Sequence, residues 1–347
     1  MSESSPFPAN IRRIGIAVPS YNVSAEEMAK VYEHFQKFGI ECVGSPLPDH
    51  CKNHFPEDDQ IIADALNTLI RDESIDLILC ARGGYGAAYL PDLIDWETLR
   101  RRALPLLGYS DVTALHLAML KHHAGCPVSS WMGIGLTKEG VDDETVKSIA
   151  KAVQRVQSQG EYNQSVKLSS VGNLTDRSVT GPVIPANLSV LCSLSGSSYL
   201  PDFDGSILIV EDIDEEPYKV DRMMLNLDLN GVFHRTAAVV GGYFSGELAG
   251  PPEEYEMILK RFARRNPQTP FFNGIPFGHS LPCSGIPAGM PAKIDPDGMI
   301  YFSAGMVFAV LAVGEKLFEK SFPPNLLSKT FIRKAVSALR TDTALAR

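Results

Sequence analysis

The chain has 347 residues and a formal net charge of −9, with 44% hydrophobic and 21% charged residues. These values are typical of a globular enzyme, and no apolar run approaches the roughly 20 residues that a membrane helix needs. The negative charge argues against a nucleic-acid partner. A chain of this length exceeds the size at which one core usually divides, which predicts two domains.

The first 150 residues alternate between strand and helix patterns. Strands are expected at Ile11–Pro19, Ile40–Val43, Ile75–Cys80, Leu104–Leu107 and Pro127–Ser130. Between them, helices are expected after Ser24, which forms a capping box with Glu27, then at Ile61–Ile70, Ala87–Leu93, from Asp95 and at Val112–Lys121. This alternation predicts an α/β fold with a Rossmann-like, doubly wound parallel sheet.

The second half has a different pattern. Residues 154–178 are polar and are interpreted as a linker or surface hairpin. Short strands are then expected at Val179–Ile184, Ser206–Glu211, Thr236–Gly241, Pro291–Ile294 and Met299–Phe302, with helices at Asn187–Leu194, Val220–Asn230 and Glu253–Arg264. We therefore expect a Rossmann-like domain over 1–153 and a β-rich mixed domain over 179–347.

Cysteine usage and the amino terminus bear on the compartment. Six cysteines, at positions 42, 51, 80, 126, 192 and 283, are scattered without a CxxC pair. The opening MSESSPFPAN lacks the basic region and apolar stretch of a secretory signal. We expect a cytoplasmic protein with free thiols and neither a disulfide framework nor a zinc site.

Two glycine-bearing turns follow two of the buried strands in the first half. Gly83, Gly84 and Gly86 follow one strand, and Ser110 follows another, so they should converge at the carboxyl edge of the sheet. That arrangement suits a serine nucleophile facing a backbone oxyanion site. Val112, however, stands where a nucleophile elbow has glycine, and an N-cap serine is the alternative. The glycine spacing fits neither the dinucleotide fingerprint nor the P-loop, so neither NAD nor ATP is expected.

Two residues of the second half could complete such a site. His279 lies in a loop between glycine and serine, where catalytic groups often occur, although it could merely bond nearby backbone. Glu211 continues an apolar strand and could orient a histidine, whereas the acidic residues after it are typical of a solvated loop or a cation site. The adjacent pair His122 and His123 cannot face one ligand, and there is no HExxH, so no metal is expected.

Several segments resemble the LD-carboxypeptidase (muramoyl-tetrapeptide carboxypeptidase) family of serine peptidases. They span most of the chain in family order: ARGGYGAAYLPDLIDW (81–96), LLGYSDVTALHLAM (106–119), ANLSVLCSLSGSSYLPDFDGSILIVEDIDEEPYKVDRMM (186–224), GGYFSGE (241–247) and IPFGHSLPCSGIPAGMPAKID (275–295). The resemblance implies a Rossmann-like and a β-rich domain, with the active site in the groove between them. It also implies a homodimer and catalysis without metal or cofactor.

The resemblance assigns a role to each matching residue. Ser110 of GYSD is the implied nucleophile, Glu211 of VEDIDE the carboxylate and His279 of FGHS the base. The backbone amides of Gly84 and Asp111 are the implied oxyanion hole.

Substrate contacts are expected beside the same turn, from Arg82, Gly83 and Tyr85. Arg82 is a candidate for a substrate carboxylate, because a guanidinium binds one through two parallel hydrogen bonds. An ion pair of Arg82 with the region of Asp92 or Asp95 is the alternative.

The implied activity is hydrolysis of an L-to-D amide bond that releases terminal D-alanine from muropeptide tetrapeptides during peptidoglycan recycling. One alternative is a microcin-immunity-type peptidase acting on peptidyl- or aminoacyl-nucleotide amides, and another is an idle peptide-binding protein. The chain departs from the family pattern at 185–187, 130–132 and 54–59, which border the groove and bear on substrate preference. The sequence does not distinguish diaminopimelate from lysine at position three of the peptide.

Overall fold

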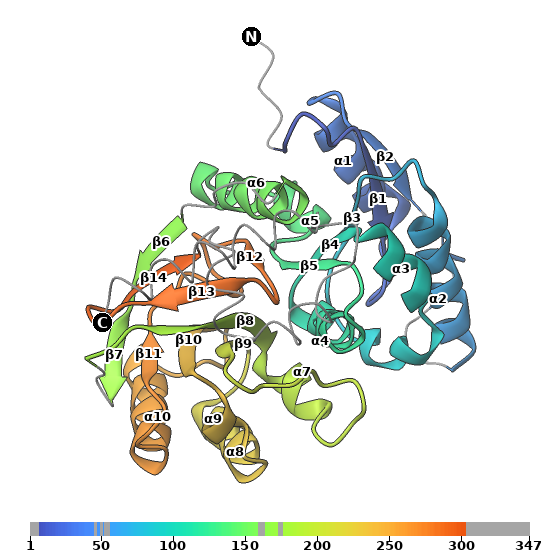
Figure 1. Ribbon diagram of the computed structural model, residues 1–347. Helices are drawn as coiled ribbons and strands as arrows, with labels where there is room; N and C mark the ends of the chain where they lie inside the picture. Colours follow the sequence, from blue (N-terminus) through green and yellow to red (C-terminus); the bar gives the residue numbers. More distant parts are fainter. Residues whose placement is uncertain are drawn as a thin grey trace, which may run out of the picture.

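The computed structural model describes residues 7–44, 47–48, 51, 56–158, 164–172 and 176–302. Of the segment 54–59, residues 54 and 55 lie outside the described residues, as does the part of the predicted second domain after 302. The described chain forms two sheets that lie side by side (Figure 1). No helix among these residues has the length and hydropathy needed to cross a membrane.

The first sheet is parallel apart from one edge strand. Its order is β12-β5-β4-β3-β1-β2, in which only the edge strand β12 runs antiparallel to its neighbour. The strands are β1 (Arg13–Ala17), β2 (Glu41–Gly44), β3 (Leu77–Cys80), β4 (Pro105–Gly108), β5 (Cys126–Ser129) and β12 (Ile286–Pro287). The predicted doubly wound parallel sheet is confirmed, with the addition of β12, which comes from the second half of the chain.

Helices cover both faces of this sheet because its strands are apolar on both sides. In β3, Leu77 and Leu79 pack into one core cluster and Ile78 and Cys80 into the other. The helices of this half are α1 (Ala25–Gln36), α2 (Pro56–Arg71), α3 (Trp96–Arg102), α4 (Thr113–His122), α5 (Gly133–Leu136) and α6 (Asp143–Ser158). Buried side chains of α1 and α6 belong to the cluster of Leu77, and those of α2 and α4 to the cluster of Ile78.

Local signals account for some of these helices and not for others. The capping box is confirmed, because Ser24 Oγ accepts a hydrogen bond from the Glu27 N–H and the Glu27 carboxylate accepts from the Ser24 N–H. The helix expected at 87–93 is wrong: two single 3₁₀ turns, Ala87–Tyr89 and Pro91–Leu93, stand there. Pro91 has no N–H to donate, so an α-helix cannot continue through it.

The second sheet is mixed, as expected for a β-rich mixed domain. Its order is β6-β14-β13-β8-β9-β10-β11-β7; the four strands β8 to β11 are parallel and the outer strands antiparallel. The strands are β6 (Gln164–Lys167), β7 (Ser169–Gly172), β8 (Val179–Asn187), β9 (Ile207–Ile213), β10 (Ala238–Ser245), β11 (Phe271–Asn273), β13 (Pro291–Ile294) and β14 (Met299–Phe302). Of the segment interpreted as a linker or surface hairpin, residues 154–158 end α6, and β6 and β7 pair with β14 and β11 rather than with each other, so the hairpin interpretation is wrong.

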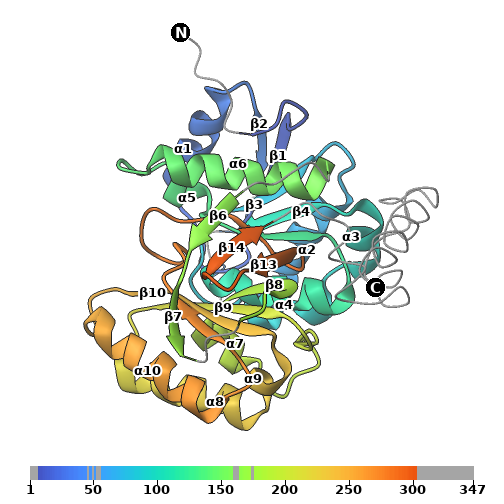
Figure 2. The same cartoon turned by 60° about the vertical axis from the view of Figure 1, so that its left-hand side comes forward.

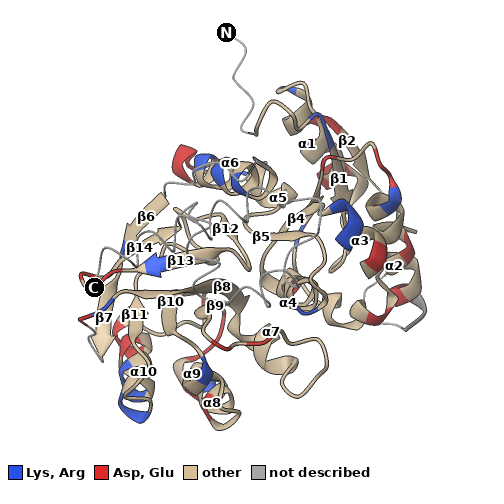
Figure 3. Ribbon diagram, viewed as in Figure 1, with Lys and Arg blue, Asp and Glu red and all other residues tan. Residues whose placement is uncertain are grey.

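Four helices accompany the second sheet: α7 (Leu188–Ser193), α8 (Pro217–Leu229), α9 (Val232–Arg235) and α10 (Pro252–Arg265). Three of them, α8, α9 and α10, lie together against one face of the sheet (Figure 2). Helix α10 is acidic in its first turn and basic in its last (Figure 3), which complements its helix dipole.

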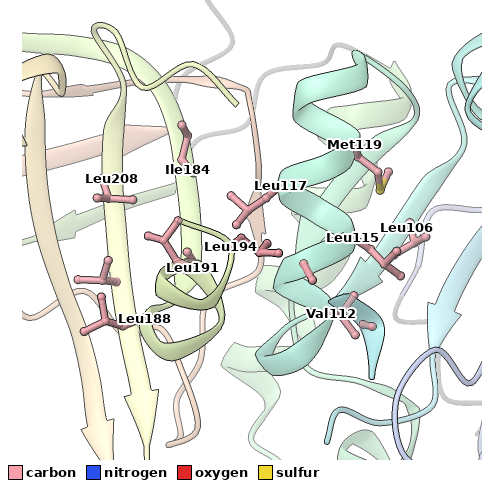
Figure 4. Packing of buried hydrophobic residues seen from close by; sticks show 14 of the residues in the cluster. Leu106, Val112, Leu115, Leu117, Met119, Ile184, Leu188, Leu191, Leu194 and Leu208 are labelled. Carbon is pink, nitrogen blue, oxygen red and sulfur yellow. The ribbon is translucent and has the colours of Figure 1, made fainter. Parts of the chain in front are cut away.

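The two halves share a packed interface built on α4. Leu117 points from α4 toward Leu191 and Leu194 of the second half, whereas Leu115 and Met119 point back toward β4 (Figure 4). All five side chains are buried in one continuous cluster. Since β12 also crosses from the second half to pair with β5, the two sheets hold one another in place.

Candidate active site

Ser110 occupies a strained turn between β4 and α4. Its φ is +59°, a left-handed conformation that is uncommon for residues other than glycine and is found at functional sites. The residue before α4 is Val112, so the alternative in which Ser110 merely caps that helix is wrong. A Cβ on Gly108 would lie 2.7 Å from a Val112 methyl group. Val112 can therefore pack this close to the end of β4 only because residue 108 has no side chain.

The glycine turn after β3 lies directly against this serine. A Cβ added to Gly83 would be 3.0 Å from Ser110 Cβ and 3.1 Å from Ser110 Oγ. Gly84 has a φ of +139°, and a Cβ there would lie 2.3 Å from the ring of Tyr21. The missing side chain at 83 thus lets the turn lie against Ser110, and the missing side chain at 84 lets it pass Tyr21.

Asp111 ties the two turns together through its carboxylate. Its Oδ2 accepts hydrogen bonds from Ser20 Oγ at 2.6 Å and from the Ala87 N–H at 2.9 Å. Burial raises the pKa of Asp111, against the opposing effect of these two hydrogen bonds. The side chain of Asp111 thus has a structural task, while its backbone N–H stays the predicted oxyanion donor.

Glu211 and His279, 68 residues apart, form a hydrogen-bonded pair. His279 Nδ1 lies 2.7 Å from Glu211 Oε2; Glu211 is fully buried and His279 is partly exposed. Because a carboxylate only accepts hydrogen bonds, we assign the proton to Nδ1, which leaves Nε2 as the acceptor of the neutral ring. Burial alone would lower the pKa of His279, but the Glu211 charge and hydrogen bond, helped by Asp212 and Asp214, raise it above its ordinary value.

The loop that carries His279 is fixed at several points. Gly278 has a φ of +126°, and a Cβ there would lie 2.7 Å from Glu211 Oε2, so only glycine lets the loop pass this close to the carboxylate. The Tyr243 N–H of β10 donates to the Phe277 carbonyl at 2.8 Å. A bond from the Ser284 N–H to the Pro276 carbonyl, 2.6 Å long, closes the loop.

Tyr109 and Trp131 join the serine turn to the histidine loop. The ring of Tyr109, next to Ser110, lies 4.6 Å from the His279 ring, centroid to centroid. The Trp131 ring stacks on the Tyr109 ring, and Trp131 Nε1 donates a hydrogen bond to the Gly278 carbonyl at 3.4 Å. The sequence predicts only that 130–132 border the groove, and the departure from the family pattern at Trp131 is the signal that points to this contact.

Arg82 and Tyr85 lie beside the glycine turn. Arg82 Nε donates to the Gly83 carbonyl at 3.3 Å, and the guanidinium lies 5.8 Å from the Tyr21 ring centroid. Asp95 instead pairs with Arg71 at 2.7 Å, and among the ion pairs of the described residues Arg82 has none with Asp92 or Asp95, so that alternative is wrong. Tyr85 is exposed and its hydroxyl lies 2.9 Å from that of Tyr89.

The acidic residues after Glu211 divide between core and surface. Asp212 is buried, and burial together with the neighbouring Glu211 charge raises its pKa to about 7. Asp214 accepts a hydrogen bond from the Glu247 N–H in an exposed turn. Within the described part of the chain, no three or more His, Cys, Asp or Glu side chains are grouped so that they could hold a metal ion.

The fold is a two-part α/β architecture in which Tyr109, next to Ser110, contacts His279, the partner of Glu211. Residues 14–130 match the model of the LD-carboxypeptidase N-terminal domain, and residues 180–294 match that of the C-terminal domain. Together these matches cover well over half of the chain. The chain belongs to the LD-carboxypeptidase family.

Individual relatives agree with this assignment. The chain is 27% identical over 288 residues to a probable murein peptide carboxypeptidase of Bacillus subtilis, covering 81% of this chain and 88% of the relative. The crystal structure of muramoyltetrapeptide carboxypeptidase from Oxalobacter formigenes has a TM-score of 0.70 and 25% identity, covering 83% of this chain and 97% of that one. The structure of MccF, a microcin C7 self-immunity protein, in complex with glutamyl sulfamoyl guanosine has a TM-score of 0.73 at 22% identity, covering 87% of this chain and 98% of that one, which shows a shared fold.

Proposed function

We propose that the protein is a metal-independent serine carboxypeptidase that hydrolyses an L-to-D amide bond, releasing terminal D-alanine from muropeptide tetrapeptides in cytoplasmic peptidoglycan recycling. The observation that carries the proposal is the buried Glu211 holding His279 Nδ1 at 2.7 Å beside the strained Ser110 turn. Family membership and relatives named for murein peptides support the substrate class. Ser110 and His279 are both partly exposed, as a site that receives a peptide requires.

In the proposed reaction, the Ser110 hydroxyl attacks the carbonyl carbon of the scissile amide while His279 Nε2 takes the serine proton. When the C–N bond breaks, the imidazolium returns that proton to the nitrogen of the departing D-alanine. Water then attacks the acyl-enzyme by the same route and restores Ser110. Glu211 stays ionised throughout, holding the ring orientation and stabilising the imidazolium.

Two further roles follow from the geometry of the glycine turn. The amides of Gly84 and Asp111 would stabilise the tetrahedral oxyanion; one such donor contributes about 3 kcal/mol to lowering a barrier of this kind. Arg82 would bind the free carboxylate of the substrate, since its guanidinium is half-buried next to the turn and forms no salt bridge among the described residues, its nearest acidic influence being the charge of Glu27. The exposed Tyr85 would contact the peptide on the same side.

The experiment is incubation of the purified protein with a panel of defined compounds, followed by mass spectrometry of the products. The panel contains muropeptide tetrapeptides with diaminopimelate or lysine at position three and an aminoacyl sulfamoyl nucleoside. We expect loss of one alanine from a tetrapeptide. Cleavage of the nucleoside alone would favour the microcin-immunity type of activity, and binding of a peptide without any cleavage would favour an idle binding protein.

A further inference from the structure

Asn187 lies where three elements meet: β9, which carries Glu211 and is called the acid strand below; α4, which follows Ser110 and is called the nucleophile helix; and α7. It ends β8 and is the N-cap of α7. Its Oδ1 accepts hydrogen bonds from the Val190 N–H at 3.2 Å and from Ser189 Oγ at 2.8 Å. These two donors fix the orientation of the amide group, because its NH₂ end must then face the other way.

The NH₂ end of Asn187 faces two buried carboxylates. Nδ2 donates to Glu211 Oε1 at 3.3 Å and to Asp212 Oδ1 at 2.9 Å. The second oxygen of Glu211, Oε2, is the one bonded to His279. Glu211 is therefore held at both oxygens, by Asn187 on one side and by the imidazole on the other.

The backbone of Asn187 contacts the other half of the site. Its N–H donates to Thr113 Oγ1 at 3.1 Å, and both residues are buried. Thr113 is the first residue of α4, three positions after Ser110. One residue thus bonds both the helix that follows the nucleophile and the carboxylate that orients the base.

We propose that Asn187 is a positioning residue that fixes the Glu211 carboxylate and sets the acid strand against the nucleophile helix. It acts through Glu211 and Thr113 and contributes to the rate of the chemical step rather than to substrate affinity. Its catalytic consequence rests on the proposed function, whereas its effect on the Glu211–His279 pair does not.

The variant that isolates this role is Asn187→Ser. Serine is as good an N-cap as asparagine, so α7 keeps its cap, but its short side chain cannot reach Glu211. Asp95→Ser is the control: Asp95 caps α3 by accepting from the Thr98 N–H at 3.1 Å and pairs with Arg71, and these contacts lie away from Ser110, Glu211 and His279. A thermal melt of both variants shows whether each still folds and how much stability its substitution costs.

The kinetic arm uses the tetrapeptide that the wild-type protein cleaves. We expect Asn187→Ser to lower kcat by about ten- to a hundredfold with KM nearly unchanged, as a misplaced catalytic group does. In a Glu211→Gln background the same change should cost less than about twofold, because residues that act through one another are not additive. An undiminished loss in that background, or a raised KM instead of a lowered kcat, would mean that Asn187 contacts the substrate and would overturn the proposal.

A second variant adds a pH signature. Asn187→Asp keeps the cap, and when protonated its side chain can still donate to Glu211. When ionised it adds a negative charge beside Glu211 and beside Asp212, whose own pKa is raised to about 7, with His279 behind Glu211. Thr113 of α4 and Ser189 of α7, which also face it, do not titrate in this range. The ratio of wild-type to variant kcat should therefore rise with pH more steeply for Asn187→Asp than for Asn187→Ser, in which only the lowered pKa of His279 contributes, and equal slopes in the two variants would count against the proposal.

The closing experiment needs no substrate: the ring of His279 is titrated by NMR in the wild-type protein, Asn187→Ser and Asp95→Ser, with its signal assigned by its loss in His279→Gln. We expect Asn187→Ser to lower the pKa of His279, because the carboxylate that raises it is no longer held against Nδ1, and Asp95→Ser to leave it unchanged. An unchanged pKa in Asn187→Ser overturns the proposal. A lowered pKa in a protein that cleaves no compound of the panel supports the positioning role and overturns the proposed function instead.

Discussion

Trp131 Nε1, from the first half of the chain, donates a hydrogen bond to the backbone carbonyl of Gly278, the residue before His279. The same indole stacks on Tyr109, whose ring contacts His279. The position of His279 relative to the Ser110 turn therefore depends on contacts that cross between the halves.

Trp131→Phe should keep the aromatic packing on Tyr109 and lose the donor. We expect kcat/KM to fall roughly three- to tenfold, since a neutral hydrogen bond contributes about 1 kcal/mol. Trp96→Phe is the matched control, because Trp96 Nε1 donates to the Pro91 carbonyl at 2.8 Å within the first half. Equal losses of kcat/KM in the two variants would show that the Trp131 bond has no special role.

Ser110→Ala and His279→Ala should each nearly abolish turnover. The double variant should cost little more than either single one, because the members of such a triad act as a unit. Turnover of the three variants can be compared by mass spectrometry over long incubations. The assignment of Ser110 would be wrong if Ser110→Ala kept more than about a tenth of wild-type turnover.

The pH dependence follows from the direction in which the pKa of His279 is shifted. His279 must be neutral to accept the serine proton, and its pKa is raised, so kcat/KM should rise with pH through a midpoint above the ordinary histidine value of about 6.5. In Glu211→Gln the raising charge is gone and burial dominates, so the midpoint should move below that value while the plateau falls. A pH profile of kcat/KM for both proteins checks this, and a midpoint that does not move would contradict the role of Glu211.

Gly84→Ala tests the oxyanion turn. The added Cβ would meet the Tyr21 ring at 2.3 Å and the residue would need a φ of +139°, so the turn must shift and kcat should fall at least tenfold. Gly39→Ala is the control: Gly39 also has a positive φ, +74°, but a Cβ there meets nothing within 4 Å. That variant should lose about 1 kcal/mol of stability and keep its kcat. Full activity of Gly84→Ala would remove the glycine turn from the mechanism.

Features specified by local sequence were predicted from it. The capping box of Ser24 and Glu27 and the apolar strands at Leu77–Cys80 and Pro105–Gly108 depend on neighbours a few residues away. Helices α5 and α9, of four residues each, were missed because they are too short to show a period, whereas α6, of 16 residues, was missed although its length is ordinary. The resemblance to a known family, rather than any local pattern, selected Ser110, Glu211 and His279 together.

Features that depend on distant parts of the chain were not predictable in this way. Strand β12, at positions 286 and 287, joins the first sheet by pairing with β5. Neither the two residues of β12 nor the four of β5 show a sequence pattern that predicts this pairing. Asn187 was noted only as part of a departure from the family pattern, although it bonds Glu211 and Thr113, 24 and 74 residues away. Such contacts are set by how the two sheets pack, which a single sequence does not reveal.

The most direct test of the central claim is stereochemical. A tetrapeptide ending in D-alanine, its counterpart ending in L-alanine and the D-form amidated at its carboxyl end are incubated with the protein, and the released residue is measured. The account predicts cleavage of the first and little or none of the other two, because an LD-carboxypeptidase must distinguish the configuration after the scissile bond and Arg82 would bind a free carboxylate. Equal hydrolysis of the D- and L-forms would contradict the proposed function, and good cleavage of the amide would remove only the role of Arg82.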